Sequence, residues 1–190
     1  QGKIDFPADY KGSWVVLFSH PADFTPVCTT EFIALSRMNE TFESLNTKLI
    51  GLSIDSLHSH LGWIKSIEAL NFNNEGKVKI PFPIIADISM NVARKYGMLQ
   101  TVANTQTVRA VFIIDPEGMI RTILYYPMST GRNIPEIIRI LQSLQLNDKT
   151  HYSTPANWQP GDAVVMGAPL TIEEAQERLE SSDNTIEHLD

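Results

Sequence analysis

The sequence lacks what several classes of protein require. Its 190 residues include one cysteine, Cys28, which excludes an internal disulfide framework and a C-x-x-C redox pair. The formal net charge is −7, so the chain lacks the basic stripe of a nucleic-acid-binding surface. No apolar run approaches the ~20 residues of a membrane span, and no charged-then-apolar leader is recognisable. We therefore expect a globular protein of the reducing cytoplasm, with neither nucleic-acid nor membrane partners.

The single cysteine lies where a predicted strand gives way to a predicted helix. Residues 14–19, WVVLFS, form the short apolar run of a buried strand. Thr25 followed by Pro26 indicates an N-cap with proline at the first helical position, and apolar residues recur at helical spacing through residues 32–45. Cys28 is then the third helical residue, where unpaired amides and the helix dipole favour an anion. We expect a reactive sulfur; the alternative is a buried, inert cysteine.

A helix terminus alone does not make a thiol reactive at neutral pH. The thiolate is the nucleophile, and a free thiol with a pKa near ~8.5 is only a few per cent thiolate. Lowering that pKa to about 6 requires roughly 3.4 kcal/mol of preference for the anion, whereas a helix terminus supplies about 0.3–1 kcal/mol. A fixed cation or further hydrogen-bond donors must therefore lie beside the sulfur.

The residues around Cys28 resemble the active-site signature of the peroxiredoxins. Pro21-x-x-x-Thr25-x-x-Cys28 matches that signature, and FSHPADFTPVCTTE resembles the one-cysteine, peroxiredoxin 6-like branch. The similarity continues through TVRAVFIIDPEG and YYPMSTGRN, so it covers nearly the whole chain. The resemblance implies a thioredoxin-like fold and a thiol-specific peroxidase of the AhpC/TSA family that uses no cofactor and no metal.

Periodicity along the chain predicts an α/β protein. The order βαβαββα is that of a thioredoxin-like fold, a central mixed sheet with flanking helices. After the strand at 14–19 and the Cys28 helix, we expect strands at 48–54, 83–86, 109–114 and 119–125, and helices at 56–70, 90–96 and 134–146. In helix 56–70 the apolar residues at helical spacing are Leu57, Leu61, Ile64 and Ile67.

The composition changes near residue 149. We assign residues 1–148 to the thioredoxin-like peroxidase domain and residues 149–190 to a C-terminal extension, in which Thr171 caps a short polar helix. Such a segment cannot build its own core. It is either a strap on the same subunit or, as the resemblance implies, a dimerisation arm.

Strand geometry selects Arg109 as the cation beside the sulfur. In a thioredoxin-like sheet the 109–114 strand runs antiparallel to the 14–19 strand, so Arg109 stands at the edge where Cys28 lies. Arg37 is more than ~13 Å along the helix from Cys28, and Arg94 is expected to be a surface charge. The resemblance also carries the catalytic arginine onto Arg109. The alternative is an edge-strand charge that guards against aggregation.

Five further residues are candidates for the site. Thr25 can either cap the helix with its hydroxyl or, as the resemblance implies, bond a peroxide oxygen and the sulfur. Glu31 can hold Arg109 in a charge-assisted pair or can be a first-turn carboxylate favoured by the dipole. Pro21 can shield the sulfur from water, and Arg132 matches a second arginine of the family. His20 matches a family histidine that could relay a proton or bind the sulfur oxyacid, or it is a structural histidine.

Two other constellations are weaker. His58 and His60 flank a helix start and point to different faces, and we expect no metal there because no further Cys or His cluster completes a site. Some peroxiredoxin 6-like proteins carry a phospholipase-type serine, histidine and aspartate. Ser13 matches that serine, but Pro7 replaces the histidine and Glu117 the aspartate. Without the base no serine is activated, so we expect no such activity.

We interpret the chain as a peroxidase that reduces hydrogen peroxide and alkyl hydroperoxides. Cys28 attacks the peroxide, while Arg109, Thr25 and the backbone of Cys28 bind it. The resulting sulfenic acid is reduced by an external thiol, such as thioredoxin or glutathione. The resemblance implies a homodimer or a ring of dimers. Two alternatives are a thioredoxin-type reductase, which would need Cys-x-x-Cys, and a non-enzymatic oligomeric chaperone or peroxide sensor.

Overall fold

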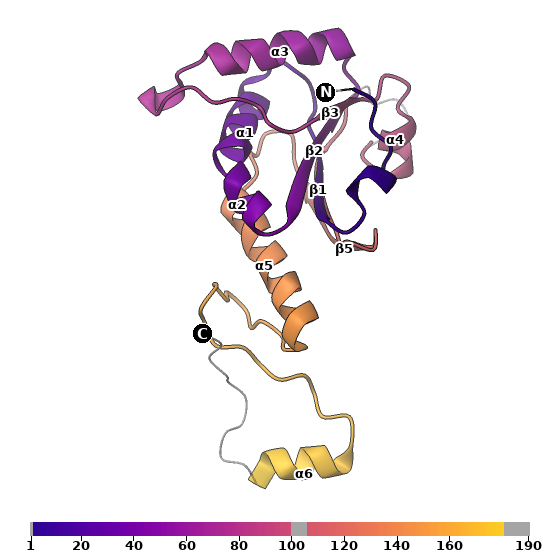
Figure 1. Cartoon of the computed structure of the whole chain (residues 1–190), viewed down its shortest axis with the longest axis vertical. Helices are drawn as coiled ribbons and strands as arrows, with labels where there is room; N and C mark the ends of the chain where they lie inside the picture. Colours follow the sequence, from indigo (N-terminus) through magenta and orange to yellow (C-terminus); the bar gives the residue numbers. More distant parts are fainter. Residues whose placement is uncertain (1, 100–105, 181–190) are drawn as a thin grey trace. The chain divides into compact units, whose positions relative to one another are not determined.

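The computed structural model describes residues 2–99 and 106–180. The chain divides into two compact units, residues 1–134 and 135–190. The first unit contains a five-stranded sheet in the order β3-β2-β1-β4-β5 (Figure 1). Its strands are β1 (Trp14–Ser19), β2 (Thr47–Ser53), β3 (Ile84–Ala86), β4 (Arg109–Ile114) and β5 (Ile120–Tyr126). Its helices are α1 (Pro26–Arg37), α2 (Asn39–Ser44), α3 (Leu57–Ala69) and α4 (Asn91–Lys95), with 3-10 turns at Ala8–Tyr10 and Phe72–Asn74. The predicted thioredoxin-like arrangement is confirmed.

The pairing of the strands determines which chain ends meet. β1 pairs parallel to β2, and β2 pairs parallel to β3. β1 pairs antiparallel to β4, with Phe18 opposite Val111, and β4 pairs antiparallel to β5. The beginning of β4 therefore lies at the edge of the sheet where β1 ends, and this register brings Arg109 toward the segment that leads into α1.

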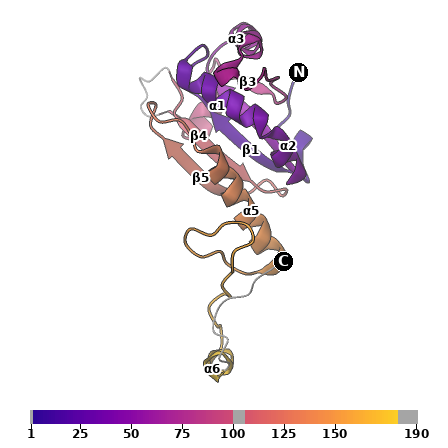
Figure 2. The same ribbon diagram turned by 90° about the vertical axis from the view of Figure 1, so that its left-hand side faces the viewer.

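The two faces of the sheet are covered by different helices of the first unit (Figures 1 and 2). Val15 and Leu17 of β1 belong to a buried cluster that includes Ala93 of α4. Phe18 points to the other face, where its ring meets Phe32 of α1 at 5.5 Å between centroids. This alternation is the period of two of a strand buried on both sides. Each fully buried apolar side chain contributes about 1.5–3 kcal/mol.

Two helical predictions were wrong in detail. The pattern through residues 32–45 is divided into α1 and α2 at Met38, whose ψ of 4° departs from helical geometry. α3 begins as expected, with Ser59 N donating to Ser56 Oγ at 3.1 Å. Its buried face, however, runs through His60, Trp63 and Ile67. Leu57 and Leu61 are 56% and 50% exposed, because Trp63 and His60 occupy the buried side of α3 in their place.

The second unit holds α5 (Ile134–Thr150), a bridge between Ser153 and Val165, and α6 (Ile172–Glu180). Glu174 N donates to Thr171 Oγ1 at 3.1 Å, the predicted cap. The units divide at the start of α5, whereas the domain boundary expected from the sequence follows that helix; that boundary stays a prediction. Across the described ranges, every helix is too short or too polar to cross a membrane.

Candidate active site

Cys28 occupies the first turn of α1. Thr25 has extended backbone angles and stands at the N-cap, with Pro26 at the first helical position. The Thr25 hydroxyl makes no cap hydrogen bond. It donates instead to the carbonyl of Ala22 at 2.8 Å, so the capping alternative does not occur here. Since that bond uses the hydroxyl proton, the lone pairs of Thr25 Oγ1 remain able to accept.

Arg109 lies directly beside the sulfur. Its Nη1 donates to Cys28 Sγ at 3.2 Å and to Glu31 Oε2 at 2.8 Å, and its Nε donates to the Met128 carbonyl at 2.9 Å. Cys28 and Arg109 are 0% and 3% exposed. Because a guanidinium does not lose its proton in proteins, the sulfur is in contact with a permanent, desolvated positive charge.

Glu31 holds a second arginine in the same buried cluster. Arg132 donates to Glu31 through its backbone N, Nε and Nη2 at 2.9, 3.0 and 2.6 Å. Its Nη1 donates to the Ser19 and Ala110 carbonyls at 2.9 and 3.1 Å. Arg132 does not contact the sulfur in these bonds; it anchors the carboxylate that orients Arg109. Two guanidiniums on one carboxylate leave an excess positive charge, and Arg109 brings part of it into contact with the sulfur.

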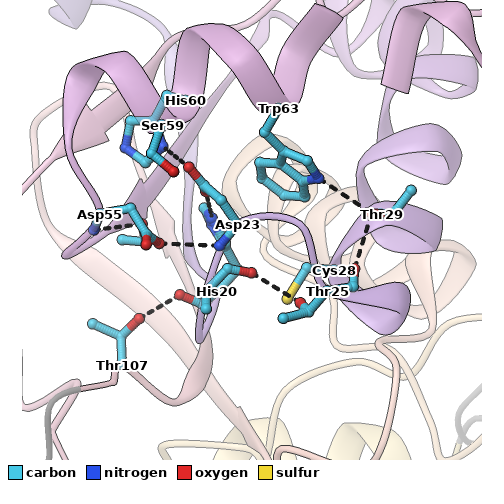
Figure 3. A network of polar contacts seen from close by, with 12 residues as sticks. His20, Asp23, Thr25, Cys28, Thr29, Asp55, Ser59, His60, Trp63 and Thr107 are labelled. Atoms are coloured by element: carbon cyan, nitrogen blue, oxygen red, sulfur yellow. Dashed lines mark hydrogen bonds and ion pairs between the residues drawn. The ribbon is translucent and has the colours of Figure 1, made fainter. Parts of the chain in front are cut away.

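His20 is found in a different cluster, with Asp23 and His60 (Figure 3). His20 Nε2 lies 2.8 Å from Asp23 Oδ1, and His60 Nδ1 lies 2.8 Å from Asp23 Oδ2. The Asp23 amide donates to Asp55 Oδ2 at 3.0 Å. Neither Asp23 nor the role of His60 was predicted from the sequence. The available signal was His20-x-x-Asp23 after a buried strand, but only the fold brings α3 and His60 to it.

The electrostatics of this cluster favour an ionised Asp23. Burial raises the pKa of Asp23, but hydrogen bonds from His20, His60 and Ser59 outweigh it and leave the pKa well below its usual range. Burial lowers the pKa of His20, against the hydrogen bond to Asp23. An ionised carboxylate only accepts hydrogen bonds, so we assign the ring protons to His20 Nε2 and His60 Nδ1. His20 Nδ1 and His60 Nε2 then carry lone pairs, and neither has a hydrogen-bond partner in the described part of the chain.

These three side chains are also of metal-ligating types, with their candidate ligand atoms within 4.8 Å of one another. The prediction that no cluster forms around His60 was therefore wrong, while His58 is exposed, on another face of the helix as expected. Coordination through the nitrogens that face Asp23 would move the ring protons to His20 Nδ1 and His60 Nε2. Two buried N–H groups would lack acceptors, at about 1–3 kcal/mol each. The residues fit a hydrogen-bonded cluster better than a metal centre.

The remaining candidates lie as follows. Pro21 is buried in the loop between β1 and α1. Arg37 forms an ion pair with Glu75 at the far end of α1, and Arg94 is exposed on α4. Neither arginine is in the Cys28 cluster.

The residues matched to a phospholipase-type set do come together, in another pocket. Ser13, Pro7 and Glu117 line a cavity of about 370 Å³ next to the beginning of β1 and the end of β4. Ser13 Oγ donates to Asn46 Oδ1 at 3.4 Å. The lining residues, all within the described ranges, include no histidine, so the pocket offers no imidazole base to activate the serine.

Family models match both parts of the chain. Residues 2–123 match the AhpC/TSA family, and residues 143–182 match the C-terminal domain of 1-Cys peroxiredoxin. A peroxiredoxin of Methanosarcina mazei is 56% identical over 192 aligned residues, which cover 100% of this chain and 88% of that protein. A peroxiredoxin of Aquifex aeolicus is 48% identical, with 94% and 83% covered.

Solved structures agree with the sequence matches. A cysteine-to-serine mutant of the peroxiredoxin 6 of Arenicola marina superposes with a TM-score of 0.82 at 40% identity, covering 93% of this chain and 81% of that one. A yeast mitochondrial 1-Cys peroxiredoxin superposes with a TM-score of 0.83 at 40% identity, covering 97% and 90%. The predicted resemblance is confirmed: this chain belongs to the AhpC/TSA family of peroxiredoxins and is a thiol-dependent peroxidase.

Proposed function

We propose that Cys28 is the peroxidatic nucleophile and that Arg109, Thr25 and the Cys28 amide bind the hydroperoxide. The observation that carries this assignment is the 3.2 Å contact from Arg109 Nη1 to Cys28 Sγ. That contact supplies the fixed cation which the helix terminus alone cannot replace. The sulfur is 0% exposed, so peroxide reaches it only when neighbouring side chains move aside.

The reaction divides between the sulfur and its neighbours. The thiolate of Cys28 forms a bond to the terminal peroxide oxygen while the O–O bond breaks. The two electrons of that bond leave with the second oxygen, which takes the hydroperoxide proton and departs as an alcohol or as water. Cys28 is left as a sulfenate, which becomes the sulfenic acid by taking up one proton from solvent. Arg109 stabilises the charge on the departing oxygen. Thr25 Oγ1, whose own proton is given to Ala22, accepts the O–H of the peroxide and orients it.

Supporting roles follow from the contacts. Glu31 and Arg132 fix the Arg109 guanidinium, because Glu31 accepts from both arginines. Pro21 is buried and has no N–H, so it restricts water near the sulfur without adding a donor. The bare Nδ1 of His20 takes the proton of the incoming thiol when the sulfenic acid is reduced.

The 190 residues contain one cysteine, and we propose that an external thiol returns the sulfenic acid to Cys28. The thiol resolving mechanism of the yeast mitochondrial relative runs via glutathione and thioredoxin systems, and we propose one of these two classes here. We also propose a homodimer or a ring of dimers in the cytoplasm, with residues 149–190 as the arm. Leu170, Ile172 and Leu179 of that segment are 91%, 74% and 78% exposed, which supports a partner surface.

The test is the fate of the sulfur itself. After one equivalent of hydrogen peroxide, mass spectrometry should find one added oxygen on Cys28, trapped as sulfenic acid. Cys28→Ser should abolish peroxide consumption with dithiothreitol while its circular dichroism stays unchanged. Retained turnover in Cys28→Ser would disprove the assignment, and oxidation without turnover would favour a peroxide sensor or chaperone.

A further inference from the structure

The carboxylate of Asp23 contacts two imidazoles, His20 in the loop after β1 and His60 on α3. We propose that His60 is a positioning residue of this peroxidase: by occupying Oδ2 of Asp23, it keeps His20 neutral, with Nε2–H toward Asp23 and a bare Nδ1. The inference rests on the proposed function, in which His20 handles a proton beside Cys28. It adds a residue on α3 that touches neither peroxide nor sulfur.

The surroundings of His20 fix the position of its backbone and ring, so that only the protonation of the ring can change. Its backbone is fixed by His20 N donating to the Leu52 carbonyl at 3.0 Å and by Thr107 Oγ1 donating to the His20 carbonyl at 2.6 Å. Its ring lies 5.0 Å from Phe32 and 4.9 Å from Trp63, centroid to centroid. Phe32 is one helical turn beyond Cys28 on α1. The imidazole is therefore held against the helix that carries the sulfur.

The two hydrogen bonds to Asp23 oppose each other in their effect on His20. A buried carboxylate with one hydrogen-bond donor strongly stabilises the protonated form of that donor. With His60 on Oδ2, part of the charge is satisfied from α3, so less of it draws a second proton onto His20. If that proton bound, the imidazolium would carry an Nδ1–H without an acceptor in the described structure. His60 thus stabilises the neutral ring.

The other charged groups around His20 act in known directions. Asp23 raises the pKa of His20, whereas Arg132, before α5, and His60, on α3, lower it. Asp55 reaches the cluster through the Asp23 amide, not through the ring. Removing His60 removes the second hydrogen-bond donor to Asp23. More of the attraction of the carboxylate then acts on His20, which increases the proton affinity of that ring.

The experiment compares two substitutions in the full chain. His60→Asn places an amide N–H near the position of Nδ1 but cannot titrate, while His60→Leu removes the donor. Long-range ¹H–¹⁵N NMR spectra of the histidine rings report tautomer and titration directly, and the chain has only five histidines to assign. We expect wild type and His60→Asn to show neutral His20 protonated at Nε2. In His60→Leu the ratio of protonated to neutral His20 should rise about tenfold at a given pH.

Turnover gives the second readout. The acidic limb of the rate–pH profile should move to higher pH in His60→Leu and stay in place in His60→Asn, whereas a structural role would lower the rate of both variants at every pH. An unchanged His20 tautomer and titration in His60→Leu would overturn the proposal, and so would a His60→Asn protein that behaves like His60→Leu. If His60→Leu does not fold, His60→Met makes the same comparison. These spectra are independent of Cys28, so a failed peroxidase assignment would show separately, as turnover by Cys28→Ser.

Discussion

Two buried clusters of the first unit each place one carboxylate between two basic side chains. The basic side chains are arginines in one cluster and histidines in the other. In the first, Glu31 lies between Arg109 and Arg132; in the second, Asp23 lies between two histidines. Guanidiniums keep their charge at every relevant pH, whereas imidazoles gain or lose a proton near neutrality. The first cluster therefore applies a constant field to Cys28, whereas the second can change its charge with pH and is held neutral at His20 by burial.

The largest effect should come from the carboxylate of the arginine cluster. Glu31→Gln leaves two guanidiniums buried without their shared anion, and breaking such a pair costs about 3–5 kcal/mol. Asp23→Asn should cost less at pH 8, because the two imidazoles are neutral in the tautomers assigned above and leave no charge unpaired. Urea denaturation of both variants at pH 8 measures the two losses. An equal or larger loss in Asp23→Asn would show that the second cluster also carries permanent charge.

Second in size is the loss of the cation itself. Arg109→Ala should slow iodoacetamide alkylation and peroxide oxidation of Cys28 at pH 7 by about 100-fold or more, as for removal of a preorganised donor at a site of developing charge. Arg37→Ala is the matched control, since it removes an arginine from α1 whose partner is Glu75. If the two variants react alike, the sulfur does not depend on the guanidinium that touches it.

A third, smaller effect separates the clusters by pH. The pKa of His20 is lowered by burial. Below about pH 6.5, His20 therefore binds a proton in the unfolded chain but not in the folded chain. Stability should fall on acidification from pH 7 to 5, by up to about 1.36 kcal/mol per unit. The lowered pKa of Asp23 acts in the same direction, but only below about pH 4. The free energy of unfolding from urea titrations at each pH measures this slope.

His20→Gln is the control for that slope. Its amide nitrogen lies near the position of Nε2 and can still donate to Asp23, but it does not titrate. The slope between pH 7 and 5 should flatten in this variant. A slope equal to that of wild type would assign the proton uptake to groups outside the cluster.

The sequence predicts the arginine cluster better than the histidine cluster, for a physical reason. In a thioredoxin-like sheet the strand direction indicates Arg109, because the antiparallel neighbour of β1 begins where β1 ends. The resemblance indicates the same residue, and it alone indicates Arg132. To predict the position of His60, one must know the rotation of α3 about its own axis, which depends on packing between helices. Leu57 and Leu61 suggested one face, and the buried side is the one with Trp63. The break at Met38 could not be predicted either, since the apolar period continues through it.

The smallest expected effect is that of Trp63, an uncharged side chain that contacts both His20 and α1. Trp63 lies against His20, and its Nε1 donates to Thr29 Oγ1 on α1 at 3.2 Å. Trp63→Phe keeps an aromatic wall beside the imidazole and loses this hydrogen bond, at about 0.5–1.5 kcal/mol. Because neither group titrates between pH 5 and 8, the loss in urea denaturation should be the same at both pH values. A loss that grows on acidification would mean that the indole helps to keep His20 neutral, and the histidine cluster would then extend to α1.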